Sequence, residues 1–513
     1  MGKMISTLCA DKPENKEHFS SILRRQVRAE VIQPKKHLKR EDSALPEKSC
    51  LARTPIAPQY DMLESVGHGA YGQVQKATFK SQLSTNRVYA VKSIDKSQFQ
   101  KEIRRFVREI EILKCLDHPN IIRFYEAYDS KNVFYIVQEF CSGGDLGKVF
   151  AKYSTRFPEN LAKDYMWQIM LALNYIHNKG IAHRDIKPEN FLLLSPEKTT
   201  LKLIDFGLSA TINSTYETIK ETVGTTFYIA PEVLELDYSP LCDVWSAGVI
   251  LYNFITCAFP FDAPTNDELF ELIKAGKYDK DILPKSGYSS EAIDLLDKML
   301  RRETEGRISA AEALQHPWFD SYRAGIKTKG EALVTTELLE NLRAFSYRSL
   351  TQRELSSLVV QTTDFDSEEV MKLCDVFRYM DQDLSGTLSA REIEAIYEKF
   401  NIKLRDGEIE EIIDSLYFKE KALVTYLEFI AATLDKEFYR NKQRIRELFN
   451  YMDVDLSGEI DYKDIQECFK RFGRLLDDSK IKRMISECDN NRDGKISFEE
   501  FYDIIVAERI RQA

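Results

Sequence analysis

The chain has 513 residues, 43% of them hydrophobic and 30% charged, which excludes a wholly disordered protein and leaves room for about two to four domains. Its 72 basic and 82 acidic residues give a net charge of -10. That charge is unevenly placed, because residues 1–50 hold 11 basic and 7 acidic residues, whereas residues 364–513 hold 24 basic and 35 acidic ones. The acidic last third argues against nucleic acid as a partner and suits divalent cations.

The cysteines and the apolar runs indicate the compartment. No two of the nine cysteines have C-x-x-C spacing, and their odd number in a long chain argues against a disulfide framework. The most apolar stretch, residues 247–261, is interrupted by polar residues and proline, so we expect a buried helix there and not a membrane span. We therefore expect a cytoplasmic protein without a secretion signal.

Residues 1–59 are expected to form a basic, flexible tail that ends in a proline-containing linker. The opening M-G-K-M-I-S fits the pattern for N-myristoylation of Gly2, although so short a pattern also occurs by chance. One myristoyl chain gives an association constant of only about 10⁴ M⁻¹, so stable membrane binding needs a second signal. Palmitoylation of Cys9 or the basic residues that follow would supply it, which predicts membrane association through lipid.

The first folded region is predicted to begin near residue 60 with V-G-H-G-A-Y-G-Q-V at 66–74. Its glycines, Gly67, Gly69 and Gly72, would let a strand-turn-strand close over phosphates without side-chain clashes, although a glycine-rich turn alone is weak evidence. V-Y-A-V-K then places Lys92 in an apolar strand, where a lysine needs an acidic partner. The charged helix that follows offers Glu109, with Glu111 as a competitor.

Three further motifs follow in a fixed order: H-R-D-I-K-P-E-N at 183–190, D-F-G at 205–207 and A-P-E at 230–232. With the glycine-rich turn and Lys92, this order and spacing resemble the eukaryotic protein kinase family across residues 60–319. The resemblance implies a two-lobed α+β fold that transfers a phosphoryl group from ATP.

The resemblance also implies roles for individual residues. Asp185 would accept the proton of the substrate hydroxyl, and Lys187 would lie near the transferred phosphoryl group. Lys92, held by Glu109, would contact the α and β phosphates, and Mg²⁺ would lie between Asn190 and Asp205. The remaining nucleotide-binding positions that the resemblance implies are Gly67, Gly69, Gly72, Val74, Ala90, Gln138, Glu139, Cys141 and Asp145.

The same region predicts the substrate and the mode of activation. In the family that it resembles, Lys187 marks serine/threonine specificity, and the acids Asp145 and Glu189 suggest substrates with basic residues N-terminal to the acceptor. Asp145 also fits a plain helix N-terminus. Arg184 calls for an anion on the activation loop, for which Glu221 is favoured and Thr218 and Thr222 compete as phosphorylation sites.

Residues 370–513 contain a repeat with a period of 36 residues, starting at Asp381, Tyr417, Asp453 and Asp489. An apolar residue follows each start by seven positions, which predicts four EF-hands, the helix–loop–helix units that bind Ca²⁺ through oxygen ligands. The expected ligands are Asp381, Asp383, Ser385, Thr387 and Glu392 in loop one; Asp453, Asp455, Ser457, Glu459 and Asp464 in loop three; and Asp489, Asn491, Asp493, Lys495 and Glu500 in loop four.

Two of the loops depart from the EF-hand pattern. Loop two has Tyr417, Lys419 and Lys421 in ligand positions and lacks the glycine, so it is expected to bind no ion. Loop three ends in Asp464 where a longer glutamate is usual, so Mg²⁺ is expected to compete with Ca²⁺ there. The sequence therefore predicts about three Ca²⁺ sites.

Residues 320–369 connect the two regions, and Leu338, Leu342 and Phe345 predict an amphipathic helix among interspersed arginines. Such a helix is either a plain linker or an element that occludes the kinase without calcium and binds the EF-hands with it. A kinase, this junction and four EF-hands in order resemble the calcium-dependent protein kinases. The resemblance implies a Ca²⁺-activated serine/threonine kinase with an all-α calmodulin-like domain; the rival is a catalytically inactive calcium sensor or scaffold.

Overall fold

The computed structural model describes residues 31–32, 56, 59–69, 72–80, 87–97, 103–153, 156–211, 224–237, 239–361, 368–416, 423–472, 474 and 476–507. These residues belong to two compact units. One contains the described residues of 1–41 and 141–322, and the other those of 42–140 and 323–513. The predicted acylation sites Gly2 and Cys9, the activation-loop residues Thr218, Glu221 and Thr222, and residues 417–422 of loop two lie outside the described residues.

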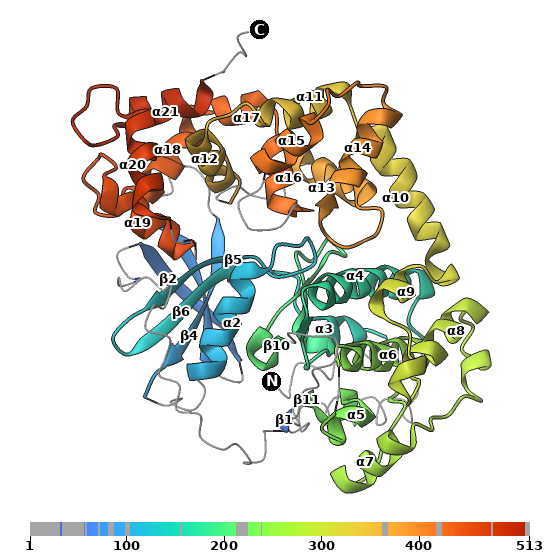
Figure 1. Cartoon of the computed structure of the whole chain (residues 1–513). Helices are drawn as coiled ribbons and strands as arrows, with labels where there is room; N and C mark the ends of the chain where they lie inside the picture. Colours follow the sequence, from blue (N-terminus) through green and yellow to red (C-terminus); the bar gives the residue numbers. More distant parts are fainter. Residues whose placement is uncertain are drawn as a thin grey trace. The chain divides into compact units, whose positions relative to one another are not determined.

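A five-stranded antiparallel sheet, in the order β2-β3-β4-β6-β5, forms the first part of the second unit. Its apolar residues alternate with more exposed ones along β4, so that Ala90 is half-buried while Val91 and Ile94 enter the core. The α2 helix contacts β5 and carries the acid predicted to pair with Lys92 (Figure 1). The elements are β2 (Tyr60–Gly69), β3 (Gly72–Phe79), β4 (Val88–Asp95), α2 (Ile103–Cys115), β5 (Phe124–Asp129) and β6 (Val133–Glu139).

The other unit is mostly helical and is built around α4 and α6, which contact each other. The helix predicted within residues 247–261 is confirmed up to Thr256, where α6 ends, and α6 is buried along nearly its whole length. Among the described residues, none of the helices combines the length and apolar character that a membrane crossing requires. The elements are β1 (Val31–Ile32), α3 (Leu146–Phe150), α4 (Glu159–Asn178), β7 (Ile181–Ala182), β8 (Phe191–Leu193), β9 (Leu201–Leu203), β10 (Ala210–Thr211), β11 (Gly224–Thr225), α5 (Pro231–Leu234), α6 (Leu241–Thr256), α7 (Asn266–Ala275), α8 (Ser290–Met299) and α9 (Ala310–Leu314).

The EF-hand region contains the predicted helix–loop–helix repeats. The apolar residue at the eighth loop position pairs with its counterpart in the neighbouring loop: Leu388 is opposite Val424, and Ile460 exchanges backbone hydrogen bonds of 2.9 Å with Ile496. The loops are therefore coupled in two pairs, as EF-hands require. The elements are α13 (Glu368–Met380), β12 (Leu388–Ser389), α14 (Ala390–Lys399), α15 (Glu408–Leu416), β13 (Leu423–Val424), α16 (Tyr426–Thr433), α17 (Lys436–Arg440), α18 (Lys442–Met452), α19 (Tyr462–Arg471), α20 (Asp478–Cys488) and α21 (Phe498–Val506).

The junction forms more helices than the sequence predicted. It contains α10 (Asp320–Leu333), α11 (Thr336–Phe345) and α12 (Leu350–Gln361). Local caps divide it: the Thr335 side chain caps α11, and Ser349 exchanges hydrogen bonds with Gln352 at the start of α12.

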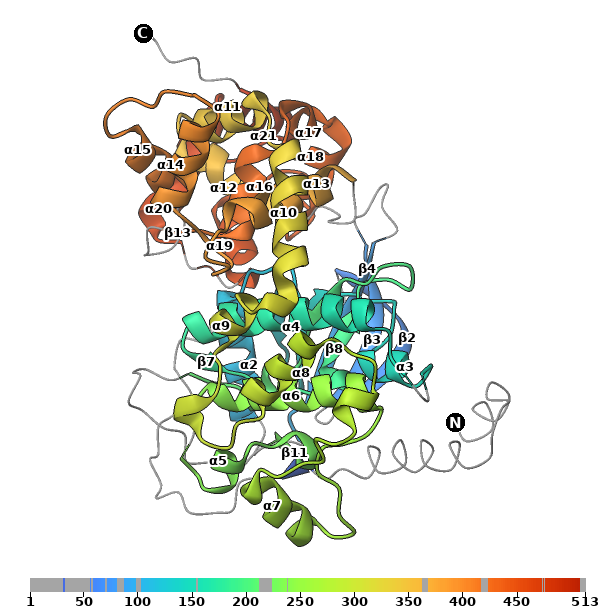
Figure 2. The ribbon, with the colours of Figure 1, turned by 90° about the vertical axis from the view of Figure 1, so that its right-hand side faces the viewer.

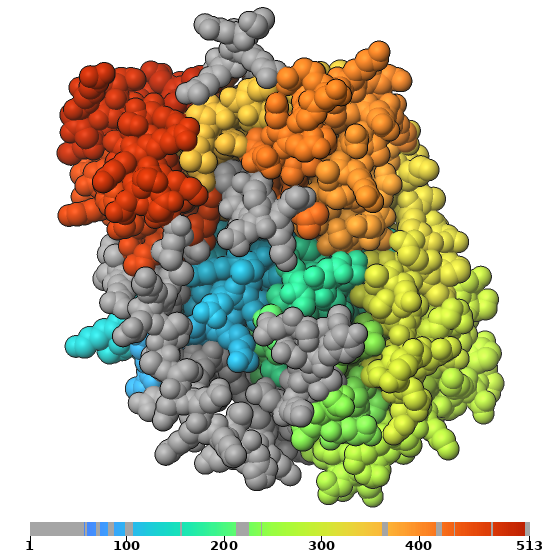
Figure 3. Space-filling model, in the orientation of Figure 1, coloured from blue at the N-terminus to red at the C-terminus, as the bar shows by residue number. Residues whose placement is uncertain are grey.

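Within the second unit, α12 contacts helices of both EF-hand pairs, namely α16 of the first pair and α18, α20 and α21 of the second (Figure 2). In the space-filling view, the gold atoms of the later part of the junction lie between the orange and red halves of the EF-hand region (Figure 3). Helices α11 and α12 of the junction are therefore an integral part of the EF-hand core and not a bare linker.

Candidate active site and calcium sites

Lys92 and Glu109 form a buried ion pair in the second unit. The Lys92 ammonium nitrogen lies 2.7 and 2.9 Å from the two carboxylate oxygens of Glu109, and the residues are 8% and 2% exposed. A buried charge is tolerated only when it is paired, so β4 and α2 are held in register by this contact. The pairing predicted from the sequence is confirmed, and it involves Glu109 and not its competitor Glu111.

The sheet register brings the other predicted nucleotide-binding residues of this unit together. Val74 lies opposite Lys92, and Ala90 lies opposite Gln138. Glycine is required at position 72, because a Cβ atom there would lie 2.1 Å from the Ser93 carbonyl oxygen. At Gly67 no atom of the described residues lies within 4 Å of an added Cβ, so among them the backbone there is open to a ligand. Gly69 ends β2, and Glu139 ends β6.

Asp185, Lys187 and Asn190 lie together in the first unit. The Lys187 ammonium is 2.7 Å from Asp185 Oδ2, and the Asn190 amide donates to the Asp185 carbonyl oxygen at 2.7 Å and to its carboxylate at 3.0 Å. These contacts hold the Asp185 carboxylate in place as a hydrogen-bond acceptor beside the Lys187 ammonium. Because the Asn190 NH₂ group is committed to Asp185, its amide oxygen is the atom that remains for a metal ion.

Thr225 completes this group and was not predicted from the sequence. Its hydroxyl donates to Asp185 Oδ1 at 2.7 Å and accepts from Lys187 at 2.9 Å. It therefore joins the start of the A-P-E segment to the catalytic loop. The only signal in the sequence was its place in G-T-T in the last part of the activation loop, which runs from Asp205 to Glu232, and hydroxyl residues are too common for that to distinguish it.

Asp243 organises the backbone of the catalytic loop. Its carboxylate accepts the N–H groups of His183 and Arg184 at 2.8 Å each, and it contacts His177 at 2.9 Å. Burial alone would raise the pKa of Asp243, but these hydrogen bonds and the two histidines lower it. Arg184 and Asp205 have φ angles of 69° and 65°, a left-handed conformation that is unfavourable for side-chain-bearing residues and concentrates at functional sites.

The two acids predicted to read basic substrates have different surroundings. Asp145 caps α3 by accepting the Lys148 N–H at 2.8 Å, so its alternative interpretation as a residue at a helix N-terminus is confirmed. Glu189 Oε2 is buried and has no hydrogen-bond partner in the described part of the chain. Burial raises the pKa of Glu189. Cys141, another of the predicted nucleotide-binding residues, is partly exposed and lies shortly before Asp145 in the chain.

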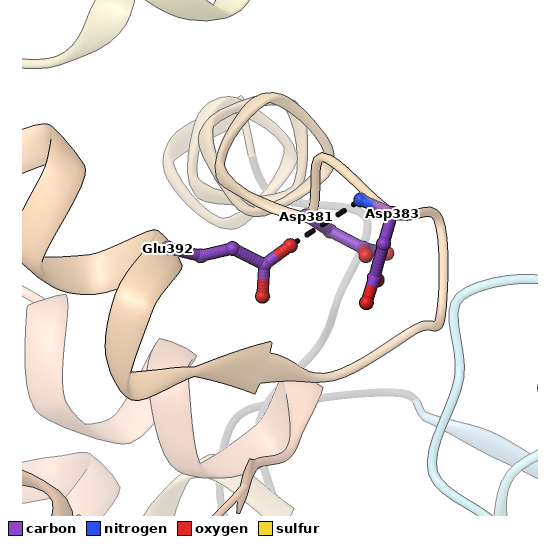
Figure 4. Close-up of side chains that lie close together, drawn as sticks. All are labelled: Asp381, Asp383 and Glu392. Atoms are coloured by element: carbon purple, nitrogen blue, oxygen red, sulfur yellow. Dashed lines mark hydrogen bonds between the residues drawn. The ribbon is translucent and has the colours of Figure 1, made fainter.

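Loop one brings three acids together: Asp381, Asp383 and Glu392, whose carboxylate oxygens lie within 4.8 Å of one another (Figure 4). Asp381 also accepts the N–H groups of Ser385 and Gly386 at 2.9 Å. Burial, with the neighbouring acids adding to it, raises the pKa of Asp381 to about 8. A divalent cation would relieve this crowding, so the donor set fits Ca²⁺.

Loop three has the same arrangement, with Asp453, Asp455 and Asp464 within 4.8 Å of one another. Asp464 is 3% exposed, and its oxygens accept the N–H groups of Val454 and Asp461 at 3.0 and 2.9 Å. The predicted position of Asp464 at the end of the loop is therefore confirmed as geometry. Glu459 contributes its carbonyl oxygen to the Ser457 hydroxyl at 2.9 Å.

Loop four folds like the others, but its acids are more open. Asp489 accepts the Gly494 N–H at 2.9 Å, and Glu500 accepts the Asn490 N–H at 2.9 Å. Among the described residues, the acids of this loop do not form a group as tight as those of loops one and three. In all three loops the glycine at the sixth position has a positive φ, which is 77° at Gly386, 87° at Gly458 and 85° at Gly494. The remaining predicted ligand residues lie in their expected loops: Ser385 and Thr387 in loop one, and Asn491, Asp493 and Lys495 in loop four.

Of the acids in loop two, the structure describes only Glu428 at the last position. Glu428 is 7% exposed and forms a capping box with Thr425, whose N–H it accepts at 2.8 Å. Its carboxylate therefore has a role in starting α16 that needs no ion.

Comparison with known proteins places this geometry in a family. The protein kinase domain family matches residues 60–319, and the EF-hand domain pair family matches residues 442–506. The chain is 36% identical to calcium-dependent protein kinase 3 of Plasmodium berghei (strain Anka), over 86% of this chain and 79% of that protein. It is 34% identical to calcium-dependent protein kinase 33 of Arabidopsis thaliana, over 86% and 83%. The chain belongs to the calcium-dependent protein kinase family. Another relative, calcium-dependent protein kinase 2 of Zea mays, is 33% identical over 88% of both chains.

As a member of this family, the chain is a calcium-dependent protein kinase that uses ATP with Mg²⁺ and binds Ca²⁺ through EF-hands. The intact Lys92–Glu109 pair and the hydrogen-bonded Asp185 argue against the catalytically inactive scaffold. The predicted α+β kinase fold followed by an all-α EF-hand region is confirmed.

Proposed function

We propose that calcium switches this protein kinase on by holding the junction helix α12 between the two EF-hand pairs. The observation that carries this proposal is that polar side chains of α12 contact both pairs. The Gln352 amide donates to the carbonyl oxygens of Ile504 and Ala507 at 3.0 and 2.8 Å, in the second pair. The Arg353 guanidinium donates to the Ser415 carbonyl oxygen at 2.8 Å, in the first pair.

Apolar packing supports the same proposal. Leu355, Leu358 and Val359 of α12 are at most 1% exposed and share one core with residues of both EF-hand pairs. Fully burying such a side chain stabilises by about 1.5–3 kcal/mol. A helix held with this much apolar contact is not available to occlude the kinase, so capture of α12 and release of the catalytic residues are one event. Calcium shifts the equilibrium toward captured α12 only to the extent that it binds the captured state more tightly than the state in which α12 is released.

The test is to introduce a charge at the centre of the captured face. Leu358→Glu places a carboxylate where the wild-type side chain is fully buried, so the calcium-stimulated rate of peptide phosphorylation should fall at least 10-fold. Thr336→Glu adds the same charge at an exposed position of α11 and should leave that rate unchanged. A Leu358→Glu enzyme with the wild-type calcium-stimulated rate would contradict capture.

The catalytic chemistry is assigned to the residues grouped above. Asp185 would orient the substrate hydroxyl and take its proton, with Thr225 fixing the carboxylate and Lys187 supplying positive charge beside the transferred group. Asn190 and Asp205 would hold Mg²⁺, which neutralises phosphate charge when bound. Lys92 would position the α and β phosphates because Glu109 holds its ammonium in place.

We infer that the substrate presents basic residues N-terminal to a serine or threonine. Glu189 Oε2, buried and without a hydrogen-bond partner in the described part of the chain, supports this, because a guanidinium would satisfy it. Strand β11 can pair with an extended chain such as a substrate peptide, because Val31 and Ile32 of the same chain pair with its residues Thr225 and Gly224. Phosphorylation of peptides with arginine or leucine before the acceptor tests this: equal kcat/KM values for the two peptides would refute it.

We infer three Ca²⁺ sites, in loops one, three and four. The carboxylate groups of loops one and three support two of them, and the left-handed glycine of loop four supports the third. The shorter Asp464 should leave loop three the least selective against Mg²⁺. Calorimetric titration of the full chain counts the sites, and four sites would refute the empty second loop.

We further propose that the N-terminus is myristoylated at Gly2, with Cys9 or the basic tail as the second membrane signal, so that the kinase is cytoplasmic and membrane-associated. The sequence pattern and the net positive tail support this. Gly2→Ala should move the protein from the membrane to the soluble fraction. An intact mass without an added acyl group would contradict it.

A further inference from the structure

A buried arginine of the EF-hand region lies against the kinase sheet within the second unit. Arg471, the last residue of α19, is 1% exposed, and its guanidinium carbon lies 5.9 Å from the ring centroid of Tyr128 on β5. None of its guanidinium nitrogens has a hydrogen-bond partner in the described part of the chain. Figure 1 shows α19 beside β5. A C-terminal arginine of a helix is ordinarily solvated, so this burial needs an explanation.

Glu126 of β5 supplies the opposite charge. It is 0% exposed, its Oε2 accepts the Tyr128 hydroxyl, and its Oε1 has no hydrogen-bond partner in the described part of the chain. Burial raises the pKa of Glu126, and the neighbouring Arg471 opposes that rise. Tyr128 connects the two side chains, because its hydroxyl donates to Glu126 and its ring centroid lies 5.9 Å from the Arg471 guanidinium carbon. Opposite charges from the sheet and from α19 are therefore buried around one tyrosine, and each would be costly to bury without the other.

The same helix carries a calcium ligand position. Asp464, the last predicted ligand of loop three, lies in the first turn of α19, and Arg471 follows it by seven residues. Seven residues are about two turns of helix and roughly 10 Å, so both residues lie on one face of α19. A movement of Asp464 toward an ion therefore turns or shifts Arg471 as well, because a packed two-turn helix moves as a rigid body.

Two further contacts join residues 117–128, the loop before β5 and most of that strand, to other parts of the calcium-sensing region. The Asp117 carboxylate accepts the Leu427 N–H at 2.8 Å and so caps α16. The Arg123 guanidinium donates to the Val360 carbonyl oxygen, near the end of α12, at 3.4 Å. We call residues 117–128 the docking segment. It follows α2 directly in the chain, and its strand β5 contacts α2, which carries Glu109.

We propose that Arg471 is a positioning residue that couples the third calcium loop to the docking segment, and through it to α2 and the Lys92–Glu109 pair. Loop three then sets the calcium response of the kinase, while the other loops act mainly on the capture of α12. This inference rests on the proposed calcium activation. It adds a route by which one loop acts on the catalytic lysine.

Paired substitutions in the full-length kinase test this coupling. Arg471→Leu removes the neighbouring positive charge from the surroundings of the buried Glu126, so we expect the calcium concentration for half-maximal activity to rise at least 10-fold. Glu126→Gln removes the opposite charge beside Tyr128 from the kinase side, without touching an EF-hand, and should shift that concentration in the same direction. The double variant Arg471→Leu/Glu126→Leu buries no charge and should recover to within about threefold of wild type. Arg483→Leu on α20, whose side chain is 59% exposed, is the matched control and should behave as wild type.

Hydrogen exchange of the full chain separates coupling from a merely structural role. Calcium should slow amide exchange in β5 and α2 of the wild type, and also of Asp381→Asn in loop one, but not of Asp453→Asn in loop three. Arg471→Leu should lose this protection while still binding calcium at loops one and four. Wild-type calcium sensitivity in Arg471→Leu, or equal protection in the two loop variants, would overturn the proposal. A wild type whose β5 and α2 respond to calcium but whose activity does not would instead refute the proposed activation.

Discussion

Replacing Arg343 with methionine removes the main cation that ties the junction to the first EF-hand pair. The Arg343 guanidinium donates to both carboxylate oxygens of Glu408, at 2.7 and 2.8 Å, and the Glu408 side chain is 0% exposed. Burial alone would raise the pKa of Glu408, but hydrogen bonds from Arg343, the Arg405 backbone and Tyr347 lower it to about 2. Against an ordinary value of about 4.3, that shift corresponds to about 3 kcal/mol for these contacts together, among which the Arg343 hydrogen bond is the largest favourable one.

Amide hydrogen exchange on the full chain measures this loss of stability in α11 and α15, the helices that carry Arg343 and Glu408. The Tyr347 and Arg405 backbone contacts remain in Arg343→Met, so about 3 kcal/mol is the upper bound of the loss, and amide exchange in α11 and at the start of α15 should speed up by at most on the order of 100-fold and by at least about 10-fold. Arg405→Met is the matched control, because Arg405 bonds the same glutamate from a side chain that is 47% exposed. An exposed pair contributes about 0–1 kcal/mol, so exchange should change less than about fivefold. Equal effects of the two substitutions would refute the argument that burial makes the Arg343 contact strong.

The pH dependence has a definite sign. The folded-state pKa of Glu408 is depressed, so its contribution to stability is fully present above the unfolded value of about 4.3 and is lost as the pH falls toward about 2. The difference in exchange between wild type and Arg343→Met should therefore shrink over that interval. A difference that stays constant down to pH 2 would mean that the ion pair is not its source.

The remaining predictions concern catalysis and metal binding. Asp205→Ala should abolish phosphoryl transfer by removing the main Mg²⁺ ligand, and Lys92→Met should lower kcat almost as far, as a peptide assay at saturating ATP would show; substantial turnover in either variant would refute the site. Thr225→Val should lower kcat by about 10–100-fold with little change in the KM for ATP, because it frees the Asp185 carboxylate; an unchanged kcat would deny Thr225 this role. Asp464→Glu should remove Mg²⁺ competition at loop three in calorimetric titrations, whereas competition that persists would place its cause elsewhere.

Much of the active site could be predicted because its residues lie in ordered local motifs. H-R-D-I-K-P-E-N brings Asp185, Lys187 and Asn190 within one short loop, so their proximity follows from the chain itself. Lys92 and Glu109 are also close in sequence, and a lysine in an apolar strand demands an acid. The pairing of Leu388 with Val424 followed from the repeat, because apolar residues recur at the same position in every loop.

The contacts that were not predicted join residues distant in the sequence. Leu427 lies 310 positions from Asp117, and Val360 lies 237 positions from Arg123, and no periodicity connects such pairs. Arg471 resembled any basic residue in the last turn of a helix, where the helix dipole favours it and solvent usually surrounds it. The division of the junction into separate helices was missed because the caps at Thr335 and Ser349 involve residues that are common within helices as well.

The most direct test of calcium activation is the initial rate of peptide phosphorylation by the full-length chain as a function of free Ca²⁺, at constant Mg²⁺ and ATP. The account predicts a low rate in chelator and a steep rise between roughly 10⁻⁷ and 10⁻⁵ M Ca²⁺, the range of sensor EF-hands. The same rise should be absent from Leu358→Glu, whose α12 cannot enter the EF-hand core. A rate that is equally high in chelator and in calcium would contradict the account.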